Sequence, residues 1–428
     1  MPTPSEAETS FQPISPVLQT LLARGYVNQS TNMAGLDEAF CAGIVPAYVG
    51  FDATADSLHV GHLLPIMTLR RLQQAGHKPI VLIGGGTTRI GDPSFRSDAR
   101  PMLDDAQIAA NIAGIASVFA RFLKFGDGPS DAMLVDNADW LDGLRYIDML
   151  RDIGRHFSVN RMLSFDSVRT RLEAQENLSF LEFNYMILQS YDFLELSRRM
   201  GCRLQMGGAD QWGNIVNGID LVRRIEGREV FGLTAPLLTT SSGAKMGKTA
   251  AGAVWLNAER LSSFDYWQFW RNTEDADVGR FLRLFTDLPM DEIAALEQAE
   301  GAALNAVKVH LAHAATALAH GSDAADAAGR AAQKLFTGRA AGEGLPLLDL
   351  DEAAPGAGLS LAQVLVEAGF AETRSAARRS IAGRGVRLEG EVVDDEELKL
   401  SVSAAPVRLS LGRKRHVMVQ IRGAAPAG

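Results

Sequence analysis

Short apolar runs alternate with stretches of helical periodicity through the first half of the chain. The runs at residues 44–49, 79–83, 132–135 and 203–206 are each followed by glycine or aspartate, which is typical of buried parallel strands. A helical pattern over residues 63–74 follows the first run and stops near Gly76. This alternation predicts a doubly wound α/β domain, whose ligands bind beyond the carboxyl ends of the strands.

The strand pattern ends near residue 261, and consecutive helices are expected over 263–271, 277–285, 290–300 and 302–319. Gly, Ala and Pro in the next segment predict a linker, and the tail predicts two short helices followed by strands. We therefore expect a disordered lead (1–16), an α/β domain (17–238), a loop and helical domain (239–337), a linker (338–358) and a small α+β unit (359–428).

Composition narrows the class of protein. The chain of 428 residues is 46% hydrophobic and 22% charged, and no apolar stretch approaches the length of a membrane span. The N-terminus lacks the features of a signal peptide, and Cys41 and Cys202 are isolated, which favours a reducing cytoplasm and no tightly bound metal. The net charge is −9, but residues 359–428 carry 11 Lys and Arg against 8 Asp and Glu. This distribution favours nucleic-acid contact confined to the tail.

The sequence His59-Val60-Gly61-His62 lies where the first apolar run gives way, through a loop, to a helix. Unpaired backbone N–H groups and the helix dipole at such a start are expected to face a phosphate, and each imidazole can donate to it. Gly61 would let a flat adenine or a ribose approach the backbone. A surface motif without a ligand, or half of a zinc site, is the alternative interpretation.

A second segment typical of a phosphate-binding site is Lys245-Met246-Gly247-Lys248-Thr249. Two lysines among small residues are typical of a mobile loop that can close over a polyphosphate and neutralise developing charge. The alternative is a solvated, lysine-bearing surface loop. Because the segment follows the last sheet-like run, it can return to the same edge of the sheet.

A polar stripe is predicted on the largely apolar helix over residues 181–196. Tyr185, Gln189 and Asp192 are spaced i, i+4 and i+7, which places them on one face. Polar groups on a buried helix need polar partners. An ammonium group and a phenolic hydroxyl suit this stripe, and a structural network in the core is the alternative.

These motifs together resemble a known family. HVGH and KMGKT match the two signature motifs of class I aminoacyl-tRNA synthetases. The segments at 48–58, 90–94, 150–154 and 207–214 resemble bacterial tyrosyl-tRNA synthetases, and the likeness extends from about residue 17 to the C-terminus. The resemblance implies a Rossmann-like catalytic domain that activates L-tyrosine with ATP and Mg²⁺ and then transfers it to tRNA(Tyr). It also implies a homodimer joined through an insertion at about 123–196.

The resemblance further implies roles for particular residues. The tyrosine-binding residues would be Tyr48, Asp92, Tyr185, Gln189, Asp192 and Gln211, with Tyr48 and Asp192 on the phenolic hydroxyl. The ATP-binding residues would be Gly50, Asp52, His59, Gly61, His62, Gly208, Asp210, Lys245 and Lys248. Catalysis would fall to Thr54, His59, His62, Lys245 and Lys248 through positioning and charge stabilisation.

The chain departs from the family pattern at three places. Val49 replaces a cysteine that contacts ribose in several relatives, Arg96 replaces a frequent lysine, and Gly247 makes the second signature a glycine variant. A tryptophanyl-tRNA synthetase is the nearest alternative, ahead of a small-molecule nucleotidyltransferase and a non-catalytic RNA-binding protein.

The tail resembles an S4 RNA-binding domain. Its RNA-binding residues would be Arg374, Arg378, Arg379, Arg384 and Arg387. Arginines of this kind grip folded RNA through its backbone and shape. A solvated arginine face is the alternative, because the acidic run at 394–397 offsets the charge.

Overall fold

The computed structural model describes residues 11–92, 103–243, 246–249, 252–336, 345–352, 358–402, 405–412 and 415–423. The chain divides into two compact units, one formed by residues 1–257 and 273–307 and the other by 258–272 and 308–428. No helix in the described ranges is long and apolar enough to cross a membrane.

The first unit is built on a six-stranded sheet with the order β1-β6-β5-β2-β3-β4. The strands are β1 (Gln29–Ser30), β2 (Pro46–Phe51), β3 (Lys78–Ile83), β4 (Met133–Asp136), β5 (Leu204–Gly208) and β6 (Phe231–Ala235). Strands β6 to β4 pair in parallel, and the short β1 runs antiparallel along β6. The strand order reverses between β2 and β5, so the expected doubly wound sheet is confirmed and its switch point lies between these strands.

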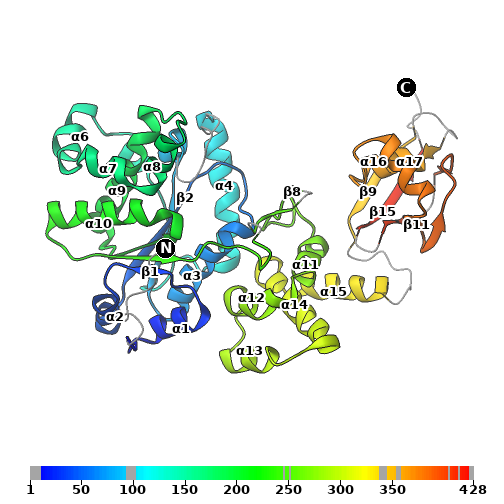
Figure 1. The fold of residues 1–428 in the computed structure, drawn as a ribbon, viewed down its shortest axis with the longest axis horizontal. Helices are drawn as coiled ribbons and strands as arrows, with labels where there is room; N and C mark the ends of the chain where they lie inside the picture. The colour runs from blue at the N-terminus through cyan, green and yellow to red at the C-terminus, as the bar shows by residue number, and fades with distance from the viewer. Residues whose placement is uncertain are drawn as a thin grey trace. The chain divides into compact units, whose positions relative to one another are not determined.

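Helices cover both sides of this sheet, with α9 and α10 on one side and α1 to α3 on the other (Figure 1). The helices of the first unit, with the 3₁₀ turns left aside, are α1 (Pro16–Arg24), α2 (Met33–Ala42), α3 (Leu63–Gln74), α4 (Asp105–Phe122), α5 (Ala138–Leu141), α6 (Tyr146–Asp152), α7 (Val159–Ser164), α8 (Asp166–Glu173), α9 (Phe180–Met200), α10 (Trp212–Glu226), α12 (Val278–Phe285) and α13 (Met290–Leu296). Helix α3 ends as expected, because Gly76 takes the left-handed φ of 87° that lets the chain turn into β3.

The helical region that we expected as one domain over 239–337 is divided between the two units. Helix α12 packs on α3, where Arg71 forms a 2.6 Å ion pair with Asp287 just beyond α12. Helix α11 (Ser263–Arg271) instead packs on α15 (Ser322–Phe336) in the second unit, and α14 (Leu304–His320) extends from one unit into the other. Helical periodicity marks these helices, but it does not specify which partner each one packs against.

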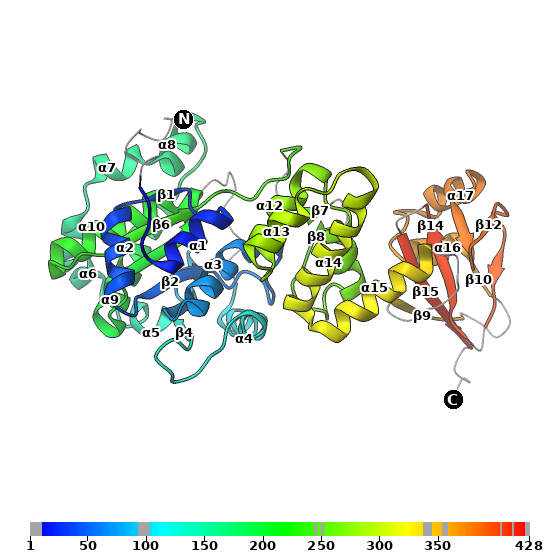
Figure 2. The same ribbon diagram turned by 90° about the horizontal axis from the view of Figure 1, so that it is seen from below.

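The tail forms a five-stranded sheet with the order β12-β11-β14-β15-β9 and two helices. Its elements are β9 (Leu347–Asp351), β10 (Leu359–Ser360), α16 (Leu361–Glu367), α17 (Arg374–Ala382), β11 (Val386–Leu388), β12 (Glu391–Val393), β13 (Lys399–Leu400), β14 (Val407–Leu411) and β15 (Arg415–Arg422). Strand β9 lies beside β15 (Figure 2), to which it pairs in parallel. The expected linker at 338–358 is therefore wrong over β9, where Leu348 and Leu350 turn toward the hydrophobic core of the tail.

Candidate active site

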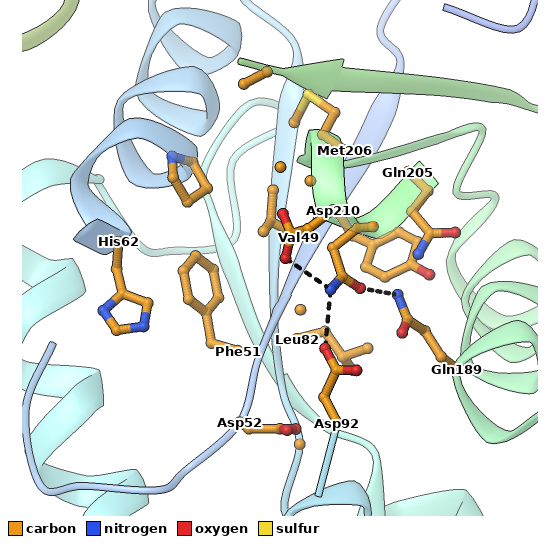
Figure 3. Close-up of a pocket in the computed structure, with 18 of the residues that line it drawn as sticks. Val49, Phe51, Asp52, His62, Leu82, Asp92, Gln189, Gln205, Met206 and Asp210 are labelled. Atoms are coloured by element: carbon orange, nitrogen blue, oxygen red, sulfur yellow. Dashed lines mark hydrogen bonds between the residues drawn. The ribbon is translucent and has the colours of Figure 1, made fainter. Parts of the chain in front are cut away.

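A cavity of about 290 Å³ lies where β2 and β5 end and the strand order reverses. Its walls come from these strand ends, from α9 and from the start of α3 (Figure 3). Apart from His59, Lys245 and Lys248, every residue that we expected to contact tyrosine or ATP lines this cavity, Thr54 among them. Segments far apart in the sequence thus meet at one site.

The segment His59-Val60-Gly61-His62 forms a 3₁₀ turn at Val60–His62 that leads directly into α3. The Nδ1 atom of His59 accepts the Gly61 N–H at 3.0 Å, and Nδ1 of His62 accepts the His59 N–H at 3.3 Å. The Val60 N–H donates to the Val254 carbonyl, and the His62 N–H donates to the His59 carbonyl. The expectation that unpaired backbone N–H groups of this turn face a phosphate is therefore wrong for these four groups, because three bond within the turn and that of Val60 bonds to Val254.

In both histidines of this turn, the ring nitrogen Nδ1 accepts a backbone N–H. A ring nitrogen that accepts a hydrogen bond carries no proton, so each neutral ring keeps its proton on Nε2. The ring centroids of His59 and His62 are 4.1 Å apart. His62 borders the cavity next to Phe51 (Figure 3).

Helix α9 carries the polar stripe that the sequence predicts. The helix is well started, because Ser179 caps the Glu182 N–H and the Glu182 carboxylate accepts the Ser179 N–H at 3.0 Å. Tyr185, Gln189 and Asp192 all line the cavity. The helical spacing therefore identified one wall of the site correctly.

Asp192 and Tyr48 are buried polar groups of the cavity, with exposed fractions of 2% and 1%. The Asp192 carboxylate accepts the Trp140 indole N–H at 2.8 Å and the Asn137 amide at 3.0 Å. The Tyr48 hydroxyl is buried and has no hydrogen-bond partner in the described part of the chain. A buried hydroxyl without a partner is unfavourable, so this end of the cavity is suited to a polar ligand group.

Burial sets the protonation of these two side chains. It raises the pKa of Asp192 to about 7, against the opposing effect of the Asn137 and Trp140 hydrogen bonds and with a smaller contribution from the nearby Asp52 carboxylate. Burial also raises the pKa of Tyr48 well above its ordinary value, and the charge of Asp192 adds to this. Tyr48 is thus a neutral hydroxyl at pH 7.

Asn137 and Trp140, which hold the Asp192 carboxylate, are residues that the sequence analysis did not single out. The Asn137 amide also donates to the Thr87 hydroxyl at 3.0 Å, which in turn donates to Asp52 at 3.1 Å. The Tyr185 hydroxyl lies 3.4 Å from both Asp52 carboxylate oxygens. The available signal was the place of Asn137 directly after β4, at the carboxyl end of a parallel strand.

Gln211 connects the carboxylates of the cavity to α9. Its Nε2 donates to Asp92 at 2.9 Å and to Asp210 at 3.3 Å, and its Oε1 accepts from Gln189 at 3.2 Å (Figure 3). The other end of the Gln189 amide, Oε1, is buried and without a partner among the described groups. This oxygen is an acceptor suited to a ligand that donates.

The second signature segment returns to the first, as the sequence suggested. Gly247 has a φ of 104°, and a Cβ atom there would lie 2.9 Å from both the Gly61 nitrogen and Nδ1 of His59. The chain then runs beside the first signature, with an isolated bridge between His59 and Trp255. Lys245 and Arg96 lie outside the described residues, and of Lys248 only its place in β7 (Lys248–Thr249) is described.

The tail carries the arginines that we expected to contact RNA. All five, Arg374, Arg378, Arg379, Arg384 and Arg387, are exposed on α17 and just beyond it. The acidic run reaches two of them, because Arg378 lies 3.5 Å from Glu397 and Arg384 lies 3.7 Å from Asp394. These are exposed pairs of small energetic value.

Within the described residues, no group of three or more His, Cys, Asp or Glu side chains is arranged to hold a metal ion.

Comparison with known proteins identifies the family. A family described as "tRNA synthetases class I (W and Y)" matches residues 44–337, and an S4 domain matches residues 360–404. The tyrosine–tRNA ligase of Dinoroseobacter shibae is 56% identical over 96% of this chain and 99% of its own length. The tyrosine–tRNA ligase of Rhodospirillum rubrum is 58% identical over 96% of this chain and 99% of its own length.

A solved structure agrees with these relatives. The C-terminally truncated mitochondrial tyrosyl-tRNA synthetase of Coccidioides posadasii superposes with a TM-score of 0.65 at 32% identity, covering 76% of this chain and 93% of that one. The fold and the two signatures define a class I tRNA synthetase. Within that class, the chain belongs to the tyrosine–tRNA ligase family, which confirms the sequence-based prediction and does not favour the tryptophan alternative.

Proposed function

We propose that the chain activates L-tyrosine with ATP to form tyrosyl-adenylate and diphosphate, and then transfers tyrosine to the 3′ end of tRNA(Tyr). The observation that carries this proposal is the buried, unpartnered Tyr48 hydroxyl in the same cavity as the Asp192 carboxylate. A phenol satisfies both groups, because it donates to a carboxylate and accepts from a hydroxyl. Phenylalanine offers neither bond, and an indole N–H donates but cannot accept.

The amino-acid end of the substrate would lie toward Gln189. Its unpartnered Oε1 is an acceptor for an ammonium group, and Tyr185 and Asp92 complete this set. Gln211 would lie near the carboxylate, where its amide is already held by Asp92 and Asp210. Fixing both ends of tyrosine would aim its carboxylate at the nucleotide, which is the positioning that this reaction needs.

ATP, as its magnesium complex, would extend from the adenosine side of the cavity toward the two signatures. Gly50, Gly61 and Gly208 leave room for the nucleotide, and Asp52 and Asp210 lie in the same cavity as acceptors for hydroxyl groups. His59, His62 and Thr54 would donate to the phosphates, and Lys245 and Lys248 would neutralise the leaving diphosphate. No side chain is required as a nucleophile, since tyrosine itself attacks the α-phosphorus.

Two further parts of the proposal concern partners. The exposed arginines on and beyond α17 would contact the tRNA backbone. The chain would also form a homodimer through the region 123–196, where apolar side chains are exposed. These are Leu134, Tyr146, Ile147, Leu150, Val159, Leu163, Leu172, Phe180 and Leu181. Exposed apolar side chains in such number support an interaction surface in this region.

Amino-acid-dependent exchange of diphosphate into ATP tests the proposed activity. Tyrosine should support exchange, whereas tryptophan and phenylalanine should not. Exchange driven by tryptophan would instead favour the neighbouring enzyme of the same class, and absence of exchange would contradict a catalytic role. Charging of tRNA(Tyr) in the same preparation tests the second step, and sedimentation tests the dimer. A cytoplasmic location stays a prediction.

A further inference from the structure

The start of helix α12 holds the chain that leads into the Lys245–Lys248 loop. We call residues 239–243 the loop stem. The Asp277 carboxylate accepts the Ser241 backbone N–H at 2.8 Å and forms a 2.7 Å ion pair with Arg280. Arg280 in turn donates to the Thr239 carbonyl. Two backbone groups of the loop stem are therefore bound by one charged pair.

Asp277 is a buried carboxylate directly before α12. It is the last residue of a 3₁₀ turn (Asp275–Asp277) that runs into α12, and its carboxylate makes no hydrogen bond to the first N–H groups of that helix. The side chain is turned to the Ser241 N–H while being almost fully buried, with 2% of the residue exposed. The carboxylate therefore binds the loop stem and not the start of its own helix.

Glu274 adds a second contact one turn earlier. Its carboxylate accepts the Ser241 hydroxyl at 2.6 Å and the Ser242 hydroxyl at 2.8 Å. Because Glu274 is exposed, these bonds are weaker constraints than those of the buried Asp277. Both acidic residues nevertheless approach the same side of the loop stem.

The far end of α12 is fastened to α3, the helix that begins at Leu63, directly after His62. Asp287 pairs with Arg70 and Arg71 of α3, the latter at 2.6 Å. The Tyr26 hydroxyl donates to the Leu284 carbonyl of α12. Helix α12 is therefore fixed against the helix of the first signature at one end and against the stem of the second signature at the other.

We propose that Asp277 is a positioning residue that sets the Lys245–Lys248 loop against His59 and His62 by tying the loop stem to α12. This inference rests on the proposed function, in which both lysines act on the diphosphate. Asp277 itself contacts no substrate. Its effect should appear in the step that uses the second signature, and binding of tyrosine in the cavity should be unaffected.

Three variants separate the contributions of the Ser241 hydrogen bond, the Asp277–Arg280 ion pair and the Thr239 hydrogen bond. Asp277→Ala removes both contacts, and Asp277→Asn keeps an acceptor oxygen for Ser241 but loses the ion pair. Arg280→Met releases Thr239 and removes the ion pair while leaving the Asp277 carboxylate to accept the Ser241 N–H. Asp291→Asn, an exposed acidic residue in the first turn of α13, is the matched control. Thermal unfolding of each variant establishes that it is folded before activity is compared.

In tyrosine-dependent exchange, Asp277→Ala should lower kcat about tenfold, with a smaller loss in Asp277→Asn, because a hydrogen bond to a charged group is lost. The KM for tyrosine should stay unchanged. In a Lys248→Ala background, Asp277→Ala should have little further effect, since the residue acts through the loop. A full additional loss in that background, an equal rise in the tyrosine KM, or the same change in Asp291→Asn would overturn the proposal.

A second measurement does not depend on activity. Trypsin cleavage after Lys245 and Lys248 should become faster in Asp277→Ala and in Arg280→Met than in the wild type and Asp291→Asn, because the loop stem is released. Unchanged cleavage in both variants would contradict the positioning role even in an active enzyme. Faster cleavage in a protein that shows no tyrosine-dependent exchange would refute the proposed function and leave the anchoring of the stem established.

Discussion

Gly61 and Gly247 face each other across the two signature motifs, with no space for a side chain between them. A Cβ atom at Gly247 would lie 2.9 Å from the Gly61 nitrogen, and one at Gly61 would lie 3.4 Å from the Met246 carbonyl oxygen. The glycine variant of the second signature is therefore a packing requirement in this chain. It lets the lysine-bearing segment lie directly on the turn that carries the two histidines.

Replacing Gly247 by alanine should push these segments apart. We expect kcat for tyrosine-dependent exchange to fall at least about fivefold, because overpacking costs about 1–3 kcal/mol and 1.4 kcal/mol is a factor of ten. Gly243→Ala is a matched control. Gly243 also has a left-handed φ, 86°, but a Cβ atom there meets nothing within 4 Å. Equal losses in both variants would assign the effect to backbone strain and not to the contact with Gly61.

The buried Tyr48 hydroxyl predicts opposite effects on stability and on selectivity. Tyr48→Phe removes a hydroxyl group without a partner. The free energy of unfolding of the ligand-free protein should therefore stay the same or rise by up to about 1 kcal/mol. The preference for tyrosine over phenylalanine in exchange should fall at least tenfold, because one bond to the substrate hydroxyl is lost. Asp192→Asn should also weaken this preference.

Tyr26→Phe is the contrasting control for that experiment. The Tyr26 hydroxyl is also buried, but it donates to the Leu284 carbonyl. Its loss should lower stability without altering the choice of amino acid. If the preference for tyrosine were unchanged in both Tyr48→Phe and Asp192→Asn, these residues would have no part in recognising the phenol.

Periodicity in the sequence was sufficient to predict features that lie within one strand or one helix. The apolar runs located β2 to β5, and the spacing of Tyr185, Gln189 and Asp192 located a wall of the cavity. The helix over 63–74 was expected with the bounds that α3 has. In each case the signal lies within a single strand or helix, where side-chain direction follows directly from backbone geometry.

Features that depend on contacts between distant segments were not predictable in this way. The partners of Asp192, namely Asn137 and Trp140, lie more than fifty positions away in the sequence. The His59 ring was expected to serve only a ligand, yet it also closes its own turn. Strand β9 was not predicted, because it is short and is a strand only through its parallel pairing with β15. Contacts between segments that are far apart in the sequence determine these features, and such contacts cannot be read from a single sequence.

The ion-pair cluster at Asp287 should make a measurable contribution to stability. Arg70 and Arg71 hold the pKa of Asp287 down to about 2, although burial opposes this shift. Because Arg71 is buried, Asp287→Asn would leave its charge poorly compensated, at a cost of roughly 2–3 kcal/mol. Asp152→Asn is the control, since Asp152 and Arg151 form an exposed pair of 2.8 Å. A comparable loss of stability in both variants would contradict the role of burial.

The raised pKa of Asp192 predicts how stability depends on pH. The pKa is about 7 in the folded protein, against an ordinary value of 3.8, mainly because the carboxyl is buried. Between pH 4 and pH 7 the folded state therefore keeps a proton that the unfolded state has released. Stability from this group is then fully present below about pH 4 and is lost as the pH rises to about 7.

Thermal midpoints of the wild type and Asp192→Asn, measured at pH 5, 6, 7 and 8, isolate this effect, because the other titrating groups are common to both proteins. The asparagine cannot ionise, so the thermal midpoint of the variant should rise relative to that of the wild type as the pH rises. The difference between the two midpoints should level off above about pH 7. Saturating tyrosine should reduce the difference by giving the carboxylate a further donor. A difference that is constant from pH 5 to pH 8 would show that Asp192 does not titrate in this range.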